Sequence, residues 1–125
     1  MLVIRLLLLL LLLATAAPAA QQPPAISLSL NPHTGYRPLN VAARILVEPN
    51  YLNQAVCLVW ESDIYSGAGC WQVEGQYAPR AHAYTIKNLP TPIDVTTVYT
   101  IWAELITVQG RHVTPIQRVQ VLFRF

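Results

Sequence analysis

The stretch LNVAARILV, residues 39–47, decides the fold class of this chain of 125 residues. Apolar side chains recur at every second position, which is the period of a β-strand with one buried face. The apolar positions are Leu39, Val41, Ala43, Ile45 and Val47. An amphipathic helix would instead repeat its apolar positions at intervals of three and four residues, so this stretch predicts a strand.

Six further stretches are typical of strands. They are ISLSL (26–30), AVCLVW (55–60), CWQVEG (70–75), HAYTIKNL (82–89), VYTIWAELITV (98–108) and QRVQVLFRF (117–125). Segments rich in proline, glycine, asparagine and aspartate separate them, and these residues favour turns. Seven short strands with turns at regular intervals and no helical period predict one all-β domain, a sandwich of about seven antiparallel strands.

The first nineteen residues have the order of a secretory signal. One positive charge, Arg5, precedes an apolar run from Leu6 to Ala14, and small residues follow it. We expect a signal peptide over 1–19, a short linker over 20–25 and the domain over 26–125. Cleavage after Ala17 is an alternative site, and a retained membrane anchor is an alternative to cleavage. Cleavage would leave no membrane span and a secreted, periplasmic or cell-surface protein.

The charge of the chain indicates which partners it lacks. Without Arg5, seven Lys and Arg residues oppose six Asp and Glu residues, so the net charge is about +1. Nucleic acids and anionic membranes are bound by clustered basic faces, so neither is an expected partner. A nearly neutral, apolar-rich chain has weak electrostatic protection against self-association, and a homo-oligomer is therefore a further expectation.

Two stretches resemble known immunoglobulin-like modules. YTIKNLPTPIDVTTVYTIWAEL (84–105) resembles fibronectin type III domains, in which an Ile-x-x-Leu-x-Pro run leads to a tyrosine at the start of the next strand. NPHTGYRPLNVAARI (31–45) is similar to the opening of polycystic-kidney-disease-type modules. The resemblance implies an immunoglobulin-like β-sandwich. The gap from Leu89 to Tyr99 is longer than in the fibronectin pattern, so we expect an irregular loop there.

The resemblance also implies the faces of individual side chains. Tyr99 would be the tyrosine-corner residue, with its ring inside and its hydroxyl bonded to upstream backbone. Alternation from Tyr99, and the family's core tryptophan, then place Trp60, Ile101 and Val121 in the core. By the same count, the outward residues of these strands include Cys57, Val59, Trp102, Glu104, Ile106, Leu122 and Arg124.

The face assignment indicates how the two cysteines are placed. If Cys57 faces outward, Cys70 must lie on the neighbouring strand, with 61–69 as the connecting loop. A secretory signal and an even cysteine count favour an intrachain disulfide. A metal site lacks a nearby histidine, and a redox dithiol lacks a Cys-x-x-Cys motif. An intermolecular disulfide is the remaining alternative.

Two surfaces are candidates for binding. The first is an outer sheet face that carries Val59, Trp102, Ile106 and Leu122, edged by Glu104 and Arg124; an exposed apolar patch with tryptophan is typical of contact surfaces. In the alternative, loop 61–69 or the 89–98 connection covers Trp102. The second candidate is a set of aromatic residues near the turns, Tyr65, Trp71 and Tyr77, which could stack on sugar rings or fill a protein pocket.

Enzymatic signatures are missing from the sequence. The three histidines are dispersed, and there is no nucleophile elbow, phosphate loop, nucleotide fingerprint or metal-ligand spacing. We therefore expect no catalytic residues, no metal and no cofactor. The predicted function is a non-catalytic binding or adhesion module for a protein or carbohydrate. The alternative is a structural subunit of a surface or pilus-like assembly built through β-strand edges.

Overall fold

The computed structural model describes residues 24–73 and 75–124, so the expected signal peptide and residues 20–23 of the linker lie outside the described residues. The described residues form nine strands. They are β1 (Ile26–Asn31), β2 (Thr34–Tyr36), β3 (Leu39–Val47), β4 (Asn53–Glu61), β5 (Ser66–Gln72), β6 (Ala81–Leu89), β7 (Thr97–Thr107), β8 (Gly110–Val113) and β9 (Gln117–Leu122). No helix within these ranges is long and apolar enough to cross a bilayer.

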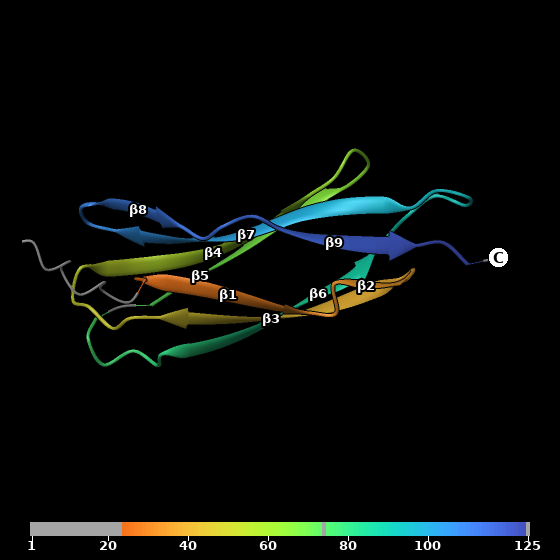
Figure 1. Cartoon of the computed structure of the whole chain (residues 1–125). Helices are drawn as coiled ribbons and strands as arrows, with labels where there is room; N and C mark the ends of the chain where they lie inside the picture. Colours follow the sequence, from red (N-terminus) through yellow and green to blue (C-terminus); the bar gives the residue numbers. More distant parts are fainter. Residues whose placement is uncertain (1–23, 74, 125) are drawn as a thin grey trace, which may run out of the picture.

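The strands form two sheets that pack face to face (Figure 1). The smaller sheet has the order β1-β3-β6, and the larger sheet has the order β2-β9-β7-β4-β5, with β8 paired to β7. The chain passes between the sheets after β1, after β2, after β3, after β5 and after β6. All pairs are antiparallel except β2 and β9.

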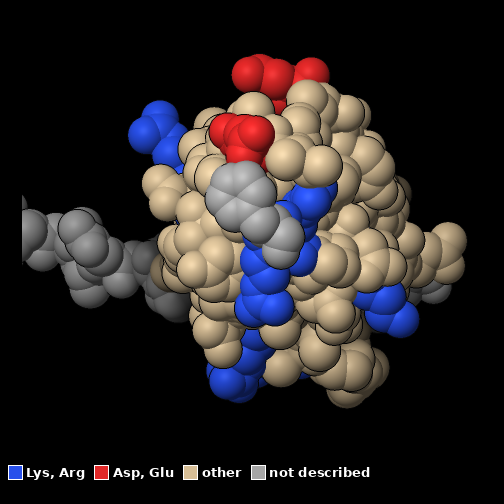
Figure 2. Space-filling view, turned by 90° about the vertical axis from the view of Figure 1, so that its right-hand side faces the viewer, with Lys and Arg blue, Asp and Glu red and all other residues tan. Residues whose placement is uncertain are grey.

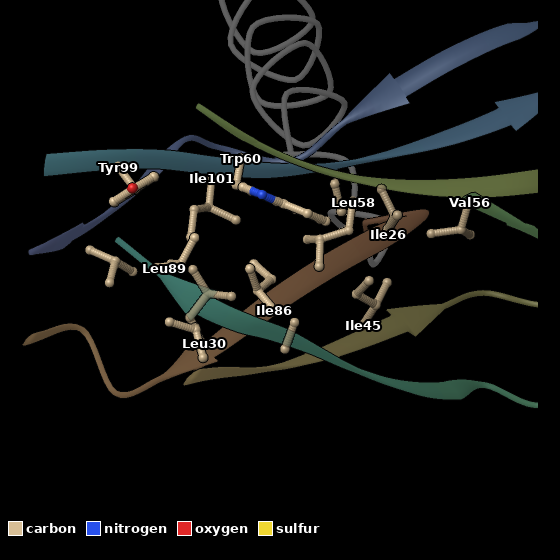
Figure 3. Close-up of a cluster of buried hydrophobic side chains, with 14 of the residues drawn as sticks. Ile26, Leu30, Ile45, Val56, Leu58, Trp60, Ile86, Leu89, Tyr99 and Ile101 are labelled. Carbon is tan, nitrogen blue, oxygen red and sulfur yellow. The ribbon is translucent and has the colours of Figure 1, made fainter. Parts of the chain in front are cut away.

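The core fills the space between the two sheets. Along β3 every second residue is buried, as the opening alternation predicts. Figure 3 shows Ile45 and Ile86 of the smaller sheet with Leu58 and Ile101 of the larger sheet, all directed into this space. Each of these side chains is at most 1% exposed, and burying one contributes about 1.5–3 kcal/mol.

Tyr99 closes one end of the core. Its ring is fully buried, and its hydroxyl donates a hydrogen bond of 2.6 Å to the carbonyl oxygen of Pro90. Burial raises the pKa of this hydroxyl above its ordinary value. The bond anchors the irregular 90–96 connection, in which Asp94 has a positive φ of 66°. This is the tyrosine corner of immunoglobulin-like domains.

The strand order, the shared core and the tyrosine corner together make the chain an immunoglobulin-like β-sandwich, which confirms the expected fold class. Two strands were not predicted, since β2 and β8 lie in segments that were interpreted as turns. They have three and four residues, and β8 is exposed throughout, so neither has a detectable apolar period. The pairing of β2 with β9 also makes the larger sheet mixed rather than wholly antiparallel.

Candidate functional site

The outer face of the larger sheet carries an apolar patch over β4, β7 and β8. Residues directly opposite in neighbouring strands share a face, so the pairs Val59–Trp102 and Ala55–Ile106 lie on the outside. Val113 of β8 pairs with Glu104 and extends the same face. We call Val59, Trp102, Ile106 and Val113 the apolar patch. Val113 is 55% exposed, and the other three are half-buried.

Polar contacts hold the Trp102 ring in the patch. The indole nitrogen Nε1 donates a hydrogen bond of 3.2 Å to Oε1 of Glu104. The second carboxylate oxygen, Oε2, forms an ion pair of 3.4 Å with Nη1 of Arg111. These contacts orient the ring, which remains partly exposed to solvent. Trp102 is thus neither fully displayed nor part of the core.

The disulfide lies beside this patch on the same outer face. Cys57 and Cys70 are directly opposite in β4 and β5, with Cα atoms 4.1 Å apart, which confirms the predicted pairing. The loop between the strands is shorter than predicted, because β5 begins at Ser66 and only 62–65 form the turn. The Ser62 hydroxyl oxygen accepts hydrogen bonds from the Tyr65 and Ile64 amides and so closes this turn locally.

Glycines, interpreted as turn residues, lie within β5 because aromatic rings need their space. Gly67 pairs with Trp60, and a Cβ atom on Gly67 would lie 2.6 Å from the indole Nε1. A Cβ atom on Gly69 would lie 2.7 Å from the Tyr84 ring. The two glycines face the core, and they make room for rings that extend toward β5 from β4 and β6.

Trp71 is directed inward, which corrects its assignment to an aromatic binding set. Its ring stacks on Tyr84 with centroids 5.7 Å apart and an angle of 7° between planes. Its Nε1 donates a hydrogen bond of 3.3 Å to Nδ1 of His82. Trp71 packs against the core and helps to close the edge between β5 and β6.

The remaining members of that set are far apart. Tyr65 is 43% exposed in the β4–β5 turn, whereas Tyr77 is 91% exposed in the β5–β6 connection. These segments lie at opposite ends of β5, a strand of seven residues and therefore about 20 Å long. The proposed surface of Tyr65, Trp71 and Tyr77 does not form.

The predicted sheet-face residues divide into two groups. Val59, Trp102, Glu104 and Ile106 lie together, as described above. Leu122 and Arg124 lie at and beyond the C-terminal end of β9, beside β2. The register of β7 with β9 places Leu122 six residues along the sheet from Trp102. At about 3.3 Å per residue this separation is about 20 Å. The two groups therefore belong to separate parts of the sheet face.

The residues that were predicted to lie in the core are found there. Trp60, Tyr99, Ile101 and Val121 are all buried between the sheets. Within the described part of the chain, no group of three or more His, Cys, Asp and Glu residues could hold a metal ion.

Comparison with known proteins gives similarity of fold only. No protein-family model and no curated protein matches the sequence. Three solved structures are similar. They are a myokine (13% identity, 78% of this chain and 95% of that chain, TM-score 0.44), the sporulation control protein Spo0M of Bacillus subtilis (17%, 77% and 48%, 0.46) and murine CRIg (16%, 80% and 98%, 0.42). The chain thus spans about half the length of Spo0M. With these identities and TM-scores, none of the three indicates a function.

Proposed function

We propose that the chain is a secreted, non-catalytic binding module that recognises a protein partner through the apolar patch. The observation that carries this proposal is the partly exposed Trp102 ring, which is hydrogen-bonded to Glu104 and lies opposite Val59. Tryptophan is enriched among the residues that dominate protein–protein binding energy. A ring that is already oriented loses little conformational entropy on binding, which favours affinity.

A protein partner fits this face better than a carbohydrate. Sugar rings are held by exposed aromatic faces, and the aromatic set that would provide them is dispersed, with Trp71 directed inward. Val59 lies directly opposite Trp102, whereas Val113 lies opposite Glu104, and Ile106 lies four residues along β7 from Trp102. Such a surface suits an apolar protein side chain surrounded by polar contacts.

Secretion and subfamily are part of the same proposal. The signal-like order of residues 1–19 and the Cys57–Cys70 disulfide support an oxidising, extracellular or periplasmic location. Within the immunoglobulin-like fold, the subfamily that we propose is fibronectin type III, on the resemblance of residues 84–105.

Substitution of Trp102 tests the proposed surface. The signal-free, oxidised domain is immobilised, and proteins that it retains from the secreted fraction of the source organism are quantified by mass spectrometry. Tyr77→Ala is the matched control, because it removes an exposed aromatic ring from the far connection. We expect a partner retained by the wild type and by Tyr77→Ala but lost with Trp102→Ala. Equal retention by all three proteins would contradict the proposal.

Assembly through strand edges is the second candidate function. β5 and β6 each have a neighbour on one side only, and residues 81–86 of β6 contain no proline and no charged side chain. Natural edge strands usually contain proline or charged side chains, which prevent pairing with another chain. The C-terminal strand does not serve this role, because β9 lies between β2 and β7. If β6 mediates assembly, the mass in solution will grow with concentration in the wild type and stay constant in Ala83→Lys.

A further inference from the structure

The corner between β2 and β9 brings together residues from both ends of the described chain. After β1 the chain crosses to the larger sheet, where β2 pairs in parallel with β9, and Tyr36 lies opposite Leu122. The amide of Arg37 then donates a hydrogen bond of 2.8 Å to the carbonyl oxygen of Leu122. This pairing sets Tyr36 and Arg37 beside the segment that contains Arg124.

Two guanidinium groups are held in place at this corner. Arg37 donates from Nη1 to the carbonyl oxygen of Thr91 at 3.1 Å and from Nη2 to that of Arg124 at 3.2 Å. The guanidinium of Arg124 lies over the Tyr36 ring, with Cζ 4.7 Å from the ring centroid. A guanidinium has five N–H donors, so each group keeps donors for a ligand while these contacts orient it.

Neither arginine of the corner has an ion pair within the described residues. Their two ion pairs, Arg80–Glu48 and Arg111–Glu104, involve neither arginine of the corner. Figure 2 shows Lys and Arg side chains gathered in a band across this end of the molecule, below two acidic patches. A cationic pair of this kind attracts an anionic group, and the attraction is strongest where the donors are already oriented.

An apolar hollow adjoins the two charges. Tyr36, Leu122, Phe123 and Arg124 line an open hollow of about 580 Å³. Tyr36 is 51% exposed, so its ring is accessible from outside as well as from beneath Arg124. The corner therefore presents oriented cationic groups and an apolar surface side by side.

We infer that this corner binds an extended acidic segment of a protein partner. A carboxylate of the segment is held by Arg37 and Arg124, and a neighbouring aromatic or aliphatic side chain occupies the hollow. Guanidinium groups match carboxylates in charge and in bidentate geometry. The site is separate from the apolar patch, because Leu122 lies about 20 Å along the sheet from Trp102.

The apolar lining favours a peptide over a sulfated glycan. A sulfated sugar chain repeats its anionic groups and needs a long basic track with little apolar surface. Here two arginines border a hollow lined by Tyr36, Leu122 and Phe123. One carboxylate beside one apolar side chain matches that combination.

A phage-displayed library of random dodecapeptides tests the inference on the signal-free, oxidised domain. Selected peptides are synthesised, and their affinities are measured at low and high salt. We expect Asp or Glu next to an aromatic or aliphatic residue, and weaker binding as salt rises. Arg37→Gln and Arg124→Gln should each weaken binding about tenfold or more.

Matched variants distinguish this site from a general effect of positive charge and from the apolar patch. Arg44→Gln removes the same charge from the outer face of the smaller sheet, and Trp102→Ala alters the apolar patch; both should bind the peptide as the wild type does. Arg124→Gln keeps the test valid if Arg37→Gln loosens the 90–96 connection, since the Arg124 side chain lies over the Tyr36 ring rather than against that connection.

Four results would overturn the inference. They are selected peptides without acidic residues, equal weakening by Arg44→Gln, tighter binding of a heparin-derived hexasaccharide than of the peptides, and a dimer in solution that Arg37→Gln dissociates. The last two would assign the corner to a glycan or to a second copy of this chain. A loss of peptide binding in Trp102→Ala would contradict the separation of the two sites.

Discussion

Gly67→Ala tests the packing of β5 against the core by the sign of its effect on stability. In a strand, glycine usually costs about 0.5–1 kcal/mol relative to alanine, because it loses more conformational freedom on folding. If Gly67 faced solvent, the substitution would therefore stabilise the domain. In the structure the new Cβ atom would lie 2.6–2.7 Å from three atoms of the Trp60 indole.

The indole has little room to move away from such an atom. Trp60 is 7% exposed and packs in the core, and its ring lies 6.0 Å from that of Tyr84. Forcing extra volume into a packed site costs about 1–3 kcal/mol. After subtraction of the gain from removing glycine, we expect Gly67→Ala to lower the free energy of unfolding by about 0–2.5 kcal/mol.

Urea unfolding, followed by circular dichroism at several wavelengths, measures this loss. Ala68→Ser is the matched control, since Ala68 is the adjacent, exposed residue of β5, and its free energy of unfolding should change by less than about 0.5 kcal/mol. In a Trp60→Phe background, which is itself less stable than the wild type, Gly67→Ala should cost less than it does in the wild type, because the smaller ring leaves space for the new Cβ atom. Stabilisation by Gly67→Ala alone would refute the inward orientation of β5.

Three further changes have expected outcomes. Replacing Cys57 and Cys70 by alanine should lower the free energy of unfolding in urea by about 3 kcal/mol, since the bridge closes a loop with a sequence separation of 13; an unchanged midpoint would contradict this. Tyr99→Phe should cost about 1 kcal/mol at neutral pH through the lost hydrogen bond to the Pro90 carbonyl. Burial raises the pKa of Tyr99 in the folded state. The stability that the protonated hydroxyl contributes is therefore complete below a pH of about 10 and is lost as the pH rises above that value. Between pH 9 and 11 the wild type should lose more stability than Tyr99→Phe. Trp102→Ala should cost about 1 kcal/mol in thermal and urea unfolding, less than the 3–5 kcal/mol expected for Trp60→Ala, and a reversed order would contradict the two placements.

Much of the fold could be predicted because burial on one face leaves a period of two. The alternation in β3 and β7 places the same side chains inward as the structure does. The tyrosine corner followed from family resemblance, and the pairing of Cys57 with Cys70 followed from the outward face of β4. Short exposed strands such as β8 leave no such period, since neither face is buried.

The candidate site could be predicted only in part, because the register between two strands cannot be determined from the sequence of either strand alone. The inward direction of Trp71 was available from the sequence, since a neighbour of the outward Cys70 in a strand must face the other side. The separation of Leu122 from Trp102 was not available, because it depends on how β9 pairs with β7. The corner of Arg37 and Arg124 depends on the crossing of the chain from β1 to β2, which has no local pattern.

Light-scattering mass and acrylamide quenching, measured together across a concentration series, test the proposed binding module most directly. The samples are the signal-free, oxidised wild type and Trp102→Phe. We predict a constant monomer mass and an accessible fluorescence component in the wild type that decreases in Trp102→Phe, because Trp60 is buried whereas Trp102 and Trp71 are each only partly buried. A mass that grows with concentration while quenching declines would contradict the account, since the apolar patch would then be a surface for assembly of the chain with itself.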